Sequence, residues 1–207
     1  LIEYMRTAKK MRTEGIEGGV GTWSPPWFSS MADASVMCYI LPTWGLHYVL
    51  KPNAEPEANK GEAEWQGDWG LAEPPASYHW GGTWAGINAR SANKELAWEF
   101  IKFITTNEEF LATWAKTTGD FLGNKKVVEK IMNDFSEPFL GGQNHYIYFN
   151  QEAAHVDVSR IGPWDFQINN AFGDQVELYA NGEKTEEQAI ADFRAAVKEI
   201  LPDVDVN

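Results

Sequence analysis

The chain has 207 residues, of which 43% are hydrophobic, and this is enough to build one large domain or parts of two. Its formal net charge is -13 and no run of Lys or Arg stands out, which argues against nucleic acid and anionic membrane surfaces as partners. No apolar run approaches the roughly 18 residues that a membrane-spanning helix needs. The single cysteine, Cys38, can form no internal disulfide and is expected to be buried.

The first third of the chain alternates helical patterns with strand-length apolar runs. Residues 1–15 have the apolar spacing of a packed helix, and a Ser followed by prolines predicts a short helix over residues 27–32. The apolar residues 35–41 predict a buried strand, which leads through a proline turn into a helix over residues 45–50. Residues 51–66 are polar and lack periodicity, so they predict a surface loop.

The middle of the chain is organised around a predicted strand that leads into an amphipathic helix. Residues 67–75 predict a strand that ends at prolines, and Gly81 and Gly82 then allow the backbone to come close to another group. A short apolar segment after them predicts a second buried strand. The amphipathic helix that follows carries its apolar face on Leu96, Ala97, Phe100, Ile101 and Ile104.

Further helices are expected from this point to the end of the chain, with caps or prolines at most of their starts. They are expected to begin at Thr106, at Asn124, after a crossing near residues 139–142, at Pro163, and at the capping box of Thr185. Gly119 and the pair Asn181 and Gly182 are expected to end two of them. The second half therefore predicts a predominantly helical region.

Tryptophan is the compositional outlier, with 10 residues beside 7 Tyr and 11 Phe. An indole offers a flat, rigid face for the C–H side of a sugar ring, and its N–H can bond a hydroxyl. The alternative for any single Trp is a large core or surface-anchoring side chain. Trp98 and Trp114 lie within helical patterns, which favours this second interpretation for them.

The sequence carries no local signature of metal, nucleotide or nucleophilic chemistry. The four histidines, His47, His79, His145 and His155, lack metal-ligand spacing, so no metal site and no cofactor is expected. The Gly-rich stretch before Gly86 lacks the Lys of a phosphate-binding loop. Carboxylates are abundant, and counting them does not dismiss a glycosidase that uses a pair of acids, although most are expected on solvated surfaces.

An ordered series of motifs resembles the C-terminal half of extracellular solute-binding proteins of sugar ABC transporters, the group that includes maltose-binding protein. The series consists of Gly86-Ile87-Asn88-Ala89, Ser91, Asn93-Lys94-Glu95-Leu96-Ala97, Glu99-Phe100 and, after a second helix, Thr118-Gly119. The resemblance extends over most of the chain, from about Leu1 to about Leu201. It is long and ordered, unlike a lone short motif.

This resemblance implies the α/β, two-lobe fold of periplasmic binding proteins of type II, with this chain supplying the C-terminal half. Residues 1–83 and 140–207 are expected to form parts of the C-terminal lobe. Residues 84–139, after a hinge crossing, are expected in the other lobe. Family members carry a further N-terminal half and a signal peptide, and the absence of a start Met and a signal here predicts a fragment of a longer product.

The implied function is an extracytoplasmic receptor, free in the periplasm or attached as a lipoprotein, that captures a sugar or oligosaccharide and delivers it to the permease subunits of an ABC transporter. It needs no catalysis, because closure of the lobes buries the ligand. The resemblance implies stacking by Trp44, Trp80 and Trp164, hydroxyl bonding by His79 and Asp165, and close backbone approach at Gly81 and Gly82. The alternatives are a glycan-active enzyme or an accessory carbohydrate-binding domain, and a fragment that binds nothing alone.

Overall fold

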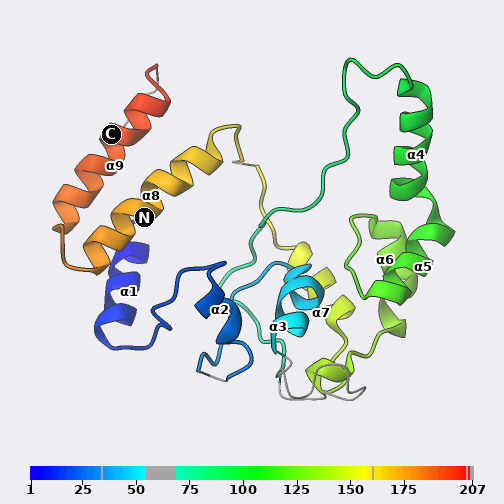
Figure 1. The fold of residues 1–207 in the computed structure, drawn as a ribbon, viewed down its shortest axis with the longest axis horizontal. Helices are drawn as coiled ribbons and strands as arrows, with labels where there is room; N and C mark the ends of the chain where they lie inside the picture. Colours follow the sequence, from blue (N-terminus) through cyan, green and yellow to red (C-terminus); the bar gives the residue numbers. More distant parts are fainter. Residues whose placement is uncertain (34, 55–68, 160, 204, 206–207) are drawn as a thin grey trace. The chain divides into compact units, whose positions relative to one another are not determined.

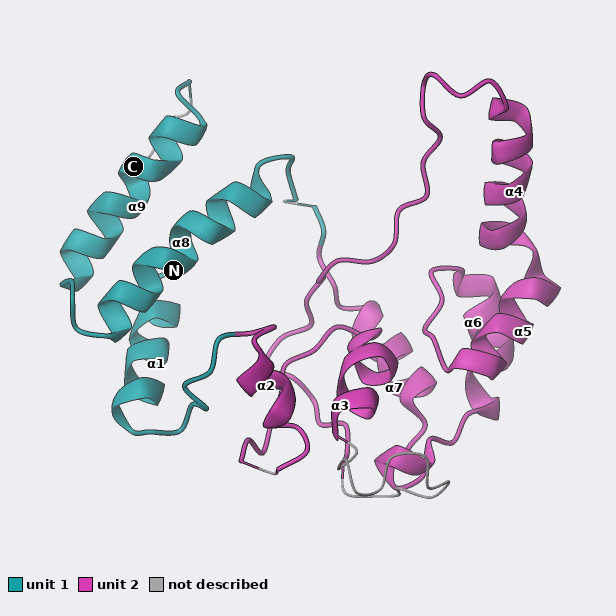
Figure 2. Ribbon diagram, in the orientation of Figure 1, with its two compact units in different colours: residues 1–21, 158–207 teal, residues 22–157 magenta. Residues whose placement is uncertain are grey.

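The computed structural model describes residues 1–33, 35–54, 69–159, 161–203 and 205 (Figure 1). The chain forms two compact units, which are coloured separately in Figure 2. Unit 1 consists of Leu1–Gly21 and Val158–Asn207, and unit 2 of Thr22–Asp157. Each unit consists of residues that pack together. The division of residues 1–83, 84–139 and 140–207 between two lobes is a separate assignment, and it stays a prediction.

Unit 1 contains the helices α1 (Ile2–Thr13), α8 (Asp165–Ala180) and α9 (Glu186–Ile200). Helix α8 packs against both α1 and α9, and Met5, Val176 and Ala189 are buried between them. The capping box predicted at Thr185 is present, because its side chain accepts a hydrogen bond from Gln188 N and the Gln188 side chain accepts one from Thr185 N. The apolar periodicity of the sequence therefore predicts all three helices of unit 1.

The first part of unit 2 contains α2 (Pro25–Ser29), the π-helix η1 (Leu46–Leu50) and α3 (Lys51–Ala54). Helix α2 begins earlier than predicted because Ser24 is its N-cap, accepting a hydrogen bond from Trp27 N. The predicted helix after the proline turn is present, but it has π geometry before it continues as α3. The start of the predicted loop over residues 51–66 is thus helical, and its remainder lies outside the described residues.

The second part of unit 2 is helical, as predicted. It contains α4 (Lys94–Thr106), α5 (Glu108–Thr118), α6 (Lys125–Ile131), η3 (Met132–Asp134), η4 (Pro138–Leu140) and α7 (His145–Ala153). The core of α5, α6 and α7 includes buried Leu111, Ala115, Val127, Val128, Ile131 and Tyr146. Asn107, one residue after the expected Thr106, caps α5, and Gly119 ends it in a left-handed conformation with φ 75°.

The predicted strands are wrong for the residues that the structure describes. Residues 35–41, 69–75 and 83–89 run through this region without forming a ladder, and the described chain contains only an isolated bridge between Glu137 and Gln143. A strand persists only when its backbone groups pair with a neighbour, and an apolar run carries no information on whether that neighbour is present. The α/β class is therefore not confirmed. Cys38, in the first of these segments, is exposed and not buried as expected.

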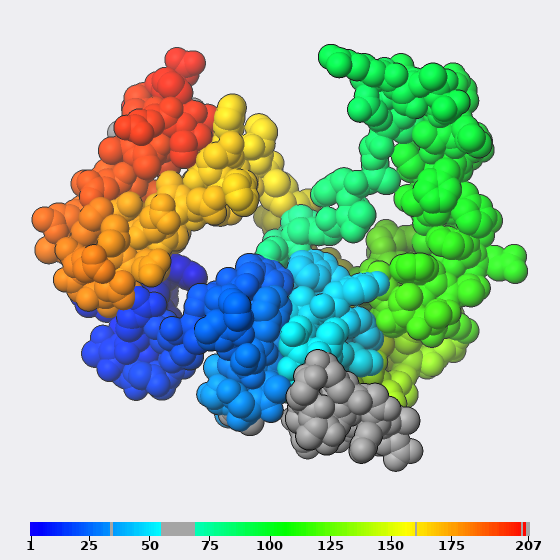
Figure 3. Space-filling view, in the orientation of Figure 1, coloured from blue at the N-terminus to red at the C-terminus, as the bar shows by residue number. Residues whose placement is uncertain are grey.

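Helix α4 forms as predicted, yet none of its residues is buried. Leu96 and Phe100, on the predicted apolar face, are 73% and 62% exposed. In the view of Figure 3, no other described segment of unit 2 covers the green surface of α4 at the upper right. Its contact with the rest of unit 2 runs through α5, where the rings of Phe103 and Phe110 lie 4.9 Å apart.

Candidate functional site

Three tryptophans from separate segments of unit 2 meet, and we call Trp23, Trp44 and Trp80 the tryptophan cluster. The rings of Trp23 and Trp44 are nearly parallel, with 10° between their planes and 6.0 Å between their centroids. The ring of Trp80 meets Trp23 edge-on at 6.1 Å. Trp23 and Trp80 remain 43% and 38% exposed, so the cluster presents indole surface to solvent.

Local backbone geometry and packing place Trp23 in this cluster. Among the described residues, Trp23 is the one non-glycine with a positive φ, at 69°, a conformation that is costly for a bulky side chain. It lies directly before Ser24, the N-cap of α2, and its ring packs against buried Trp27 at 5.1 Å. Strained backbone of this kind persists where the surrounding structure imposes it, and it is concentrated at functional sites.

The segment with His79, Trp80, Gly81 and Gly82 lies beside Trp44. The hydroxyl of Tyr78 donates a 2.6 Å hydrogen bond to the Leu41 carbonyl and so joins the two segments. Gly81 has φ 71°, and a Cβ placed there would lie 3.8 Å from Nε1 of Trp44. Gly82, with φ 121°, has open space around it. His79 is exposed, so its imidazole is available to a ligand.

Trp164 and Asp165 belong to unit 1. Trp164 is the N-cap residue of α8 and is 45% exposed, and Asp165 is the first residue of that helix. Asp165 Oδ1 would lie 3.7 Å from a Cβ placed on Gly162, so the carboxylate lies over the turn before the helix. The structure thus brings Trp44, Trp80, Gly81 and Gly82 together in unit 2, while the roles of Trp164 and Asp165 stay predictions.

Trp23 was not predicted as a site residue, although the sequence contains one signal for it. Trp23, Trp27 and Phe28 crowd the start of a proline-initiated helix, and aromatic residues at that density on a loop are unusual for a solvated turn. The sequence places Trp23 in a loop with no defined orientation. Only contacts with residues 44 and 80 reveal that its ring belongs to the cluster.

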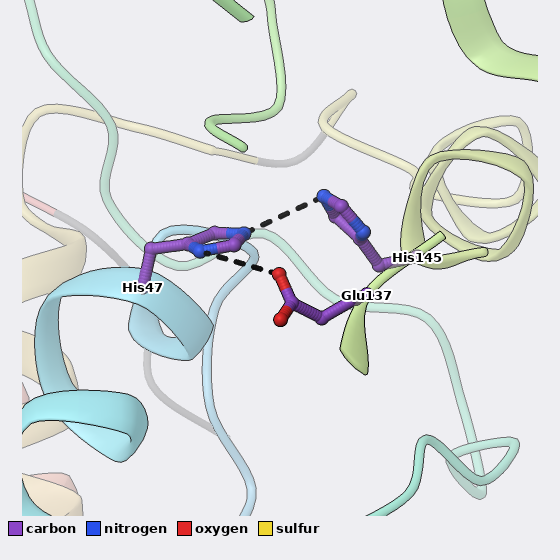
Figure 4. A group of neighbouring side chains, drawn as sticks. All are labelled: His47, Glu137 and His145. Atoms are coloured by element: carbon purple, nitrogen blue, oxygen red, sulfur yellow. Dashed lines mark hydrogen bonds and ion pairs between the residues drawn. The ribbon is translucent and has the colours of Figure 1, made fainter. Parts of the chain in front are cut away.

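A second group in unit 2 was also missed, and it consists of His47, Glu137 and His145 (Figure 4). His47 lies on the π-helix, Glu137 just before η4, and His145 at the start of α7. Their potential ligand atoms lie within 4.8 Å of one another. The residues are too far apart in the sequence for a spacing motif to connect them, which is why no metal site was expected.

The electrostatics of this group favour neutral imidazoles beside a charged carboxylate. Burial, then repulsion from His145 in its protonated form and from Lys51, lowers the pKa of His47 to about 4, and burial also lowers the pKa of His145. Burial alone would raise the pKa of Glu137, but the hydrogen bond and charge of Lys51 outweigh it and lower that pKa. The 4.0 Å approach of His47 Nδ1 to Glu137 Oε2 is therefore not an ion pair at neutral pH.

Comparison with known protein families identifies the family of this chain. The model of the bacterial extracellular solute-binding proteins matches residues 2–138, more than half of the sequence. The chain belongs to this family. Comparison with curated protein sequences gives no match.

Membership of this solute-binding family establishes the general function. The protein is an extracytoplasmic receptor that binds a solute for an ABC transporter membrane complex, and the family is generally non-enzymatic. Within the part of the chain that the structure describes, no helix has the length and apolar character to cross a membrane. The family match confirms the predicted extracytoplasmic localisation, and the class of the solute is the next question.

Proposed function

We propose that the solute of this receptor is a sugar or oligosaccharide and that the tryptophan cluster stacks on it. The observation that carries the proposal is the convergence of Trp23, Trp44 and Trp80 with indole surface left exposed. Aromatic side chains that serve only a core bury their rings, as Trp27 does next to this cluster. An exposed aromatic surface in a binding protein is suited to the apolar face of a sugar ring.

The polar contacts expected for sugar hydroxyls come from the neighbouring segment. His79 is exposed beside Trp80 and can donate or accept a hydrogen bond. Gly81 and Gly82 carry no side chain that would keep a ligand from the backbone amides, and their positive φ values suit glycine. On the strength of the resemblance alone, we also propose a stacking role for Trp164 and an acceptor role for Asp165, both in unit 1.

We also propose the two-lobe arrangement of the family with hinge closure about the ligand, in which residues 84–139 belong to the second lobe. The uncovered apolar face of α4, including Leu96 and Phe100, supports a partner for this helix outside the described residues. The proposed partner is the N-terminal half of the receptor. The delivery of sugar to permease subunits follows the same proposal.

The experiment is calorimetric titration of the intact protein with a panel of monosaccharides and oligosaccharides, together with amino acids and peptides. We expect a sugar to bind, and Trp23→Ala and Trp80→Ala to weaken it by about 1–3 kcal/mol each, the usual size of a lost stacking contact. Trp98→Ala is the matched control, because this exposed indole on α4 lies outside the cluster and should leave binding unchanged.

Two outcomes would contradict the proposal. Binding of an amino acid or peptide in place of every sugar would overturn the carbohydrate class. Equal losses from Trp98→Ala and Trp23→Ala would show that the cluster is not the binding surface. Chromatography of the sugar after incubation tests the enzyme alternative, and we expect the sugar to be recovered intact.

A further inference from the structure

We propose that His47, Glu137 and His145 form a binding site for a divalent transition metal ion, best suited to Zn²⁺. The three residues come from η1, from the turn before η4 and from α7, all within unit 2. Two imidazoles and a carboxylate are a donor set that zinc sites use, with a fourth position left for another oxygen. Solute binding does not depend on this inference, and neither does the inference depend on the nature of the solute.

The spacing of the two imidazoles matches a shared ion. His47 Nε2 and His145 Nε2 lie 3.4 Å apart. Two nitrogens bound to one tetrahedral zinc at about 2.0–2.1 Å lie roughly 3.4 Å apart, so neither ring has to move far to hold the ion. Figure 4 shows the edges of the two rings turned toward each other, with the Glu137 carboxylate beside them.

Glu137 is held so that one oxygen remains for an ion. Its Oε1 accepts hydrogen bonds from Lys51 Nζ at 2.9 Å and from Phe139 N at 3.1 Å. Oε2 faces the ring of His47 at 4.0 Å. The Lys51 side chain is 35% exposed, so its ammonium can turn toward solvent when a cation enters.

His145 is buried, and only one of its two ring nitrogens has a hydrogen-bond partner among the described residues. The residue is 2% exposed, and its Nε2 lies 2.9 Å from the Gly119 carbonyl oxygen. Its Nδ1 is buried and has no hydrogen-bond partner among the described residues. A neutral imidazole has one protonated nitrogen and one with a lone pair, so an ion bound at Nε2 would replace the hydrogen bond to the Gly119 oxygen and leave the proton on Nδ1.

The backbone at Gly119 completes the site. A Cβ at this residue would lie 2.4 Å from Cε1 of His47, so the imidazole occupies the space that a side chain would take. The Gly119 carbonyl oxygen, already close to His145 Nε2, is a further oxygen donor at the same place. The proposed ion would join η1, the end of α5 and the start of α7, and would therefore stabilise unit 2.

The test is metal binding by the intact protein after treatment with a chelator. Titration with Co²⁺ should produce the visible absorption of a tetrahedral cobalt site, and calorimetry with Zn²⁺ should give one ion per chain and a raised Tm. His145→Gln and Glu137→Gln each remove a ligand, so the Kd for Zn²⁺ should rise by at least the roughly 10–100-fold that loss of an outer-shell partner costs. His155→Gln is the control, because this exposed histidine of unit 2 lies outside the group.

Absence of both the cobalt absorption and a Zn²⁺-dependent rise in Tm in the unaltered protein would overturn the proposal, whether or not any variant folds. Equal Zn²⁺ affinity in His145→Gln and His155→Gln would do the same, because binding would then occur elsewhere on the surface. Circular dichroism of each variant without metal shows whether a loss of binding follows from unfolding. If His145→Gln does not fold, Glu137→Gln, which keeps the shape of the side chain, tests whether the group binds the ion.

Discussion

Helix α4 and the neighbouring helices α5 to α7 carry similar apolar patterns but have different surroundings. In the second group, Leu111, Val127 and Tyr146 are buried in one core. In α4 no residue is buried, and Leu96 is 73% exposed. The difference shows that an apolar stripe predicts a helix and the face it would bury, but not whether a partner for that face lies within the chain.

The largest expected effect contrasts the two regions directly. Tyr146 is fully buried, stacks on Phe135 at 3.8 Å and donates a hydrogen bond to the Asp120 carbonyl. Tyr146→Ala should lower the free energy of unfolding by about 3–5 kcal/mol, as large core truncations do. In the 207-residue chain without the proposed N-terminal half, Leu96→Ala should change it by less than about 0.5 kcal/mol. Urea denaturation of both variants measures the contrast, and similar losses would show that the face of α4 is covered within this chain.

The second prediction concerns His47, whose ring packs against that of buried His145 at the start of α7. The folded-state pKa of His47, about 4, lies below its unfolded value, so the unfolded chain binds more protons between these values. With metal removed by a chelator, the free energy of unfolding should be highest above pH 6.5 and should fall by up to about 3 kcal/mol as the pH drops toward 4. His47→Gln should flatten this part of the profile in urea denaturation, and an unchanged slope would contradict the assignment.

The third prediction concerns the end of α5. Gly119 combines φ 75° with the close approach of the His47 ring, so Gly119→Ala should cost about 1–3 kcal/mol of unfolding free energy. Gly123 is the matched control, because a Cβ there meets nothing within 4 Å. Gly123→Ala should leave the thermal midpoint nearly unchanged. A loss as large as that of Gly119→Ala would point to a general cost of adding a side chain in this loop.

The smallest effect compares the first turns of α4 and α5. Asn107 caps α5, because its side chain accepts a hydrogen bond from Phe110 N at 2.8 Å, whereas the Asn93 side chain makes no such bond for α4. Asn107→Ala should therefore destabilise the protein by about 1 kcal/mol, and Asn93→Ala by a few tenths at most. Thermal unfolding of the pair tests this, and a larger loss from Asn93→Ala would indicate that it caps α4 in solution.

The sequence determined the helices after residue 90 and several of their ends, because caps and periodicity act within one turn of the chain. The helix predicted to begin at Pro163 begins two residues later, at Asp165. Asn124, Gly119 and the capping box at Thr185 have the predicted roles. The motifs from Gly86 to Gly119 also pointed to the solute-binding family that the comparison then identified. Trp44 and Trp80 were selected from the same resemblance, and their place in one cluster came from the structure.

Tertiary structure decided what depends on residues far apart in the sequence. Apolar runs such as residues 35–41 predicted strands, but strand formation needs a pairing neighbour, and the described chain supplies none. Trp23 joined Trp44 and Trp80, and His47 met Glu137 and His145, only when the chain folded. Local patterns specify which residues can form a helix or bind a ligand, whereas only packing brings their side chains within a few ångströms of one another.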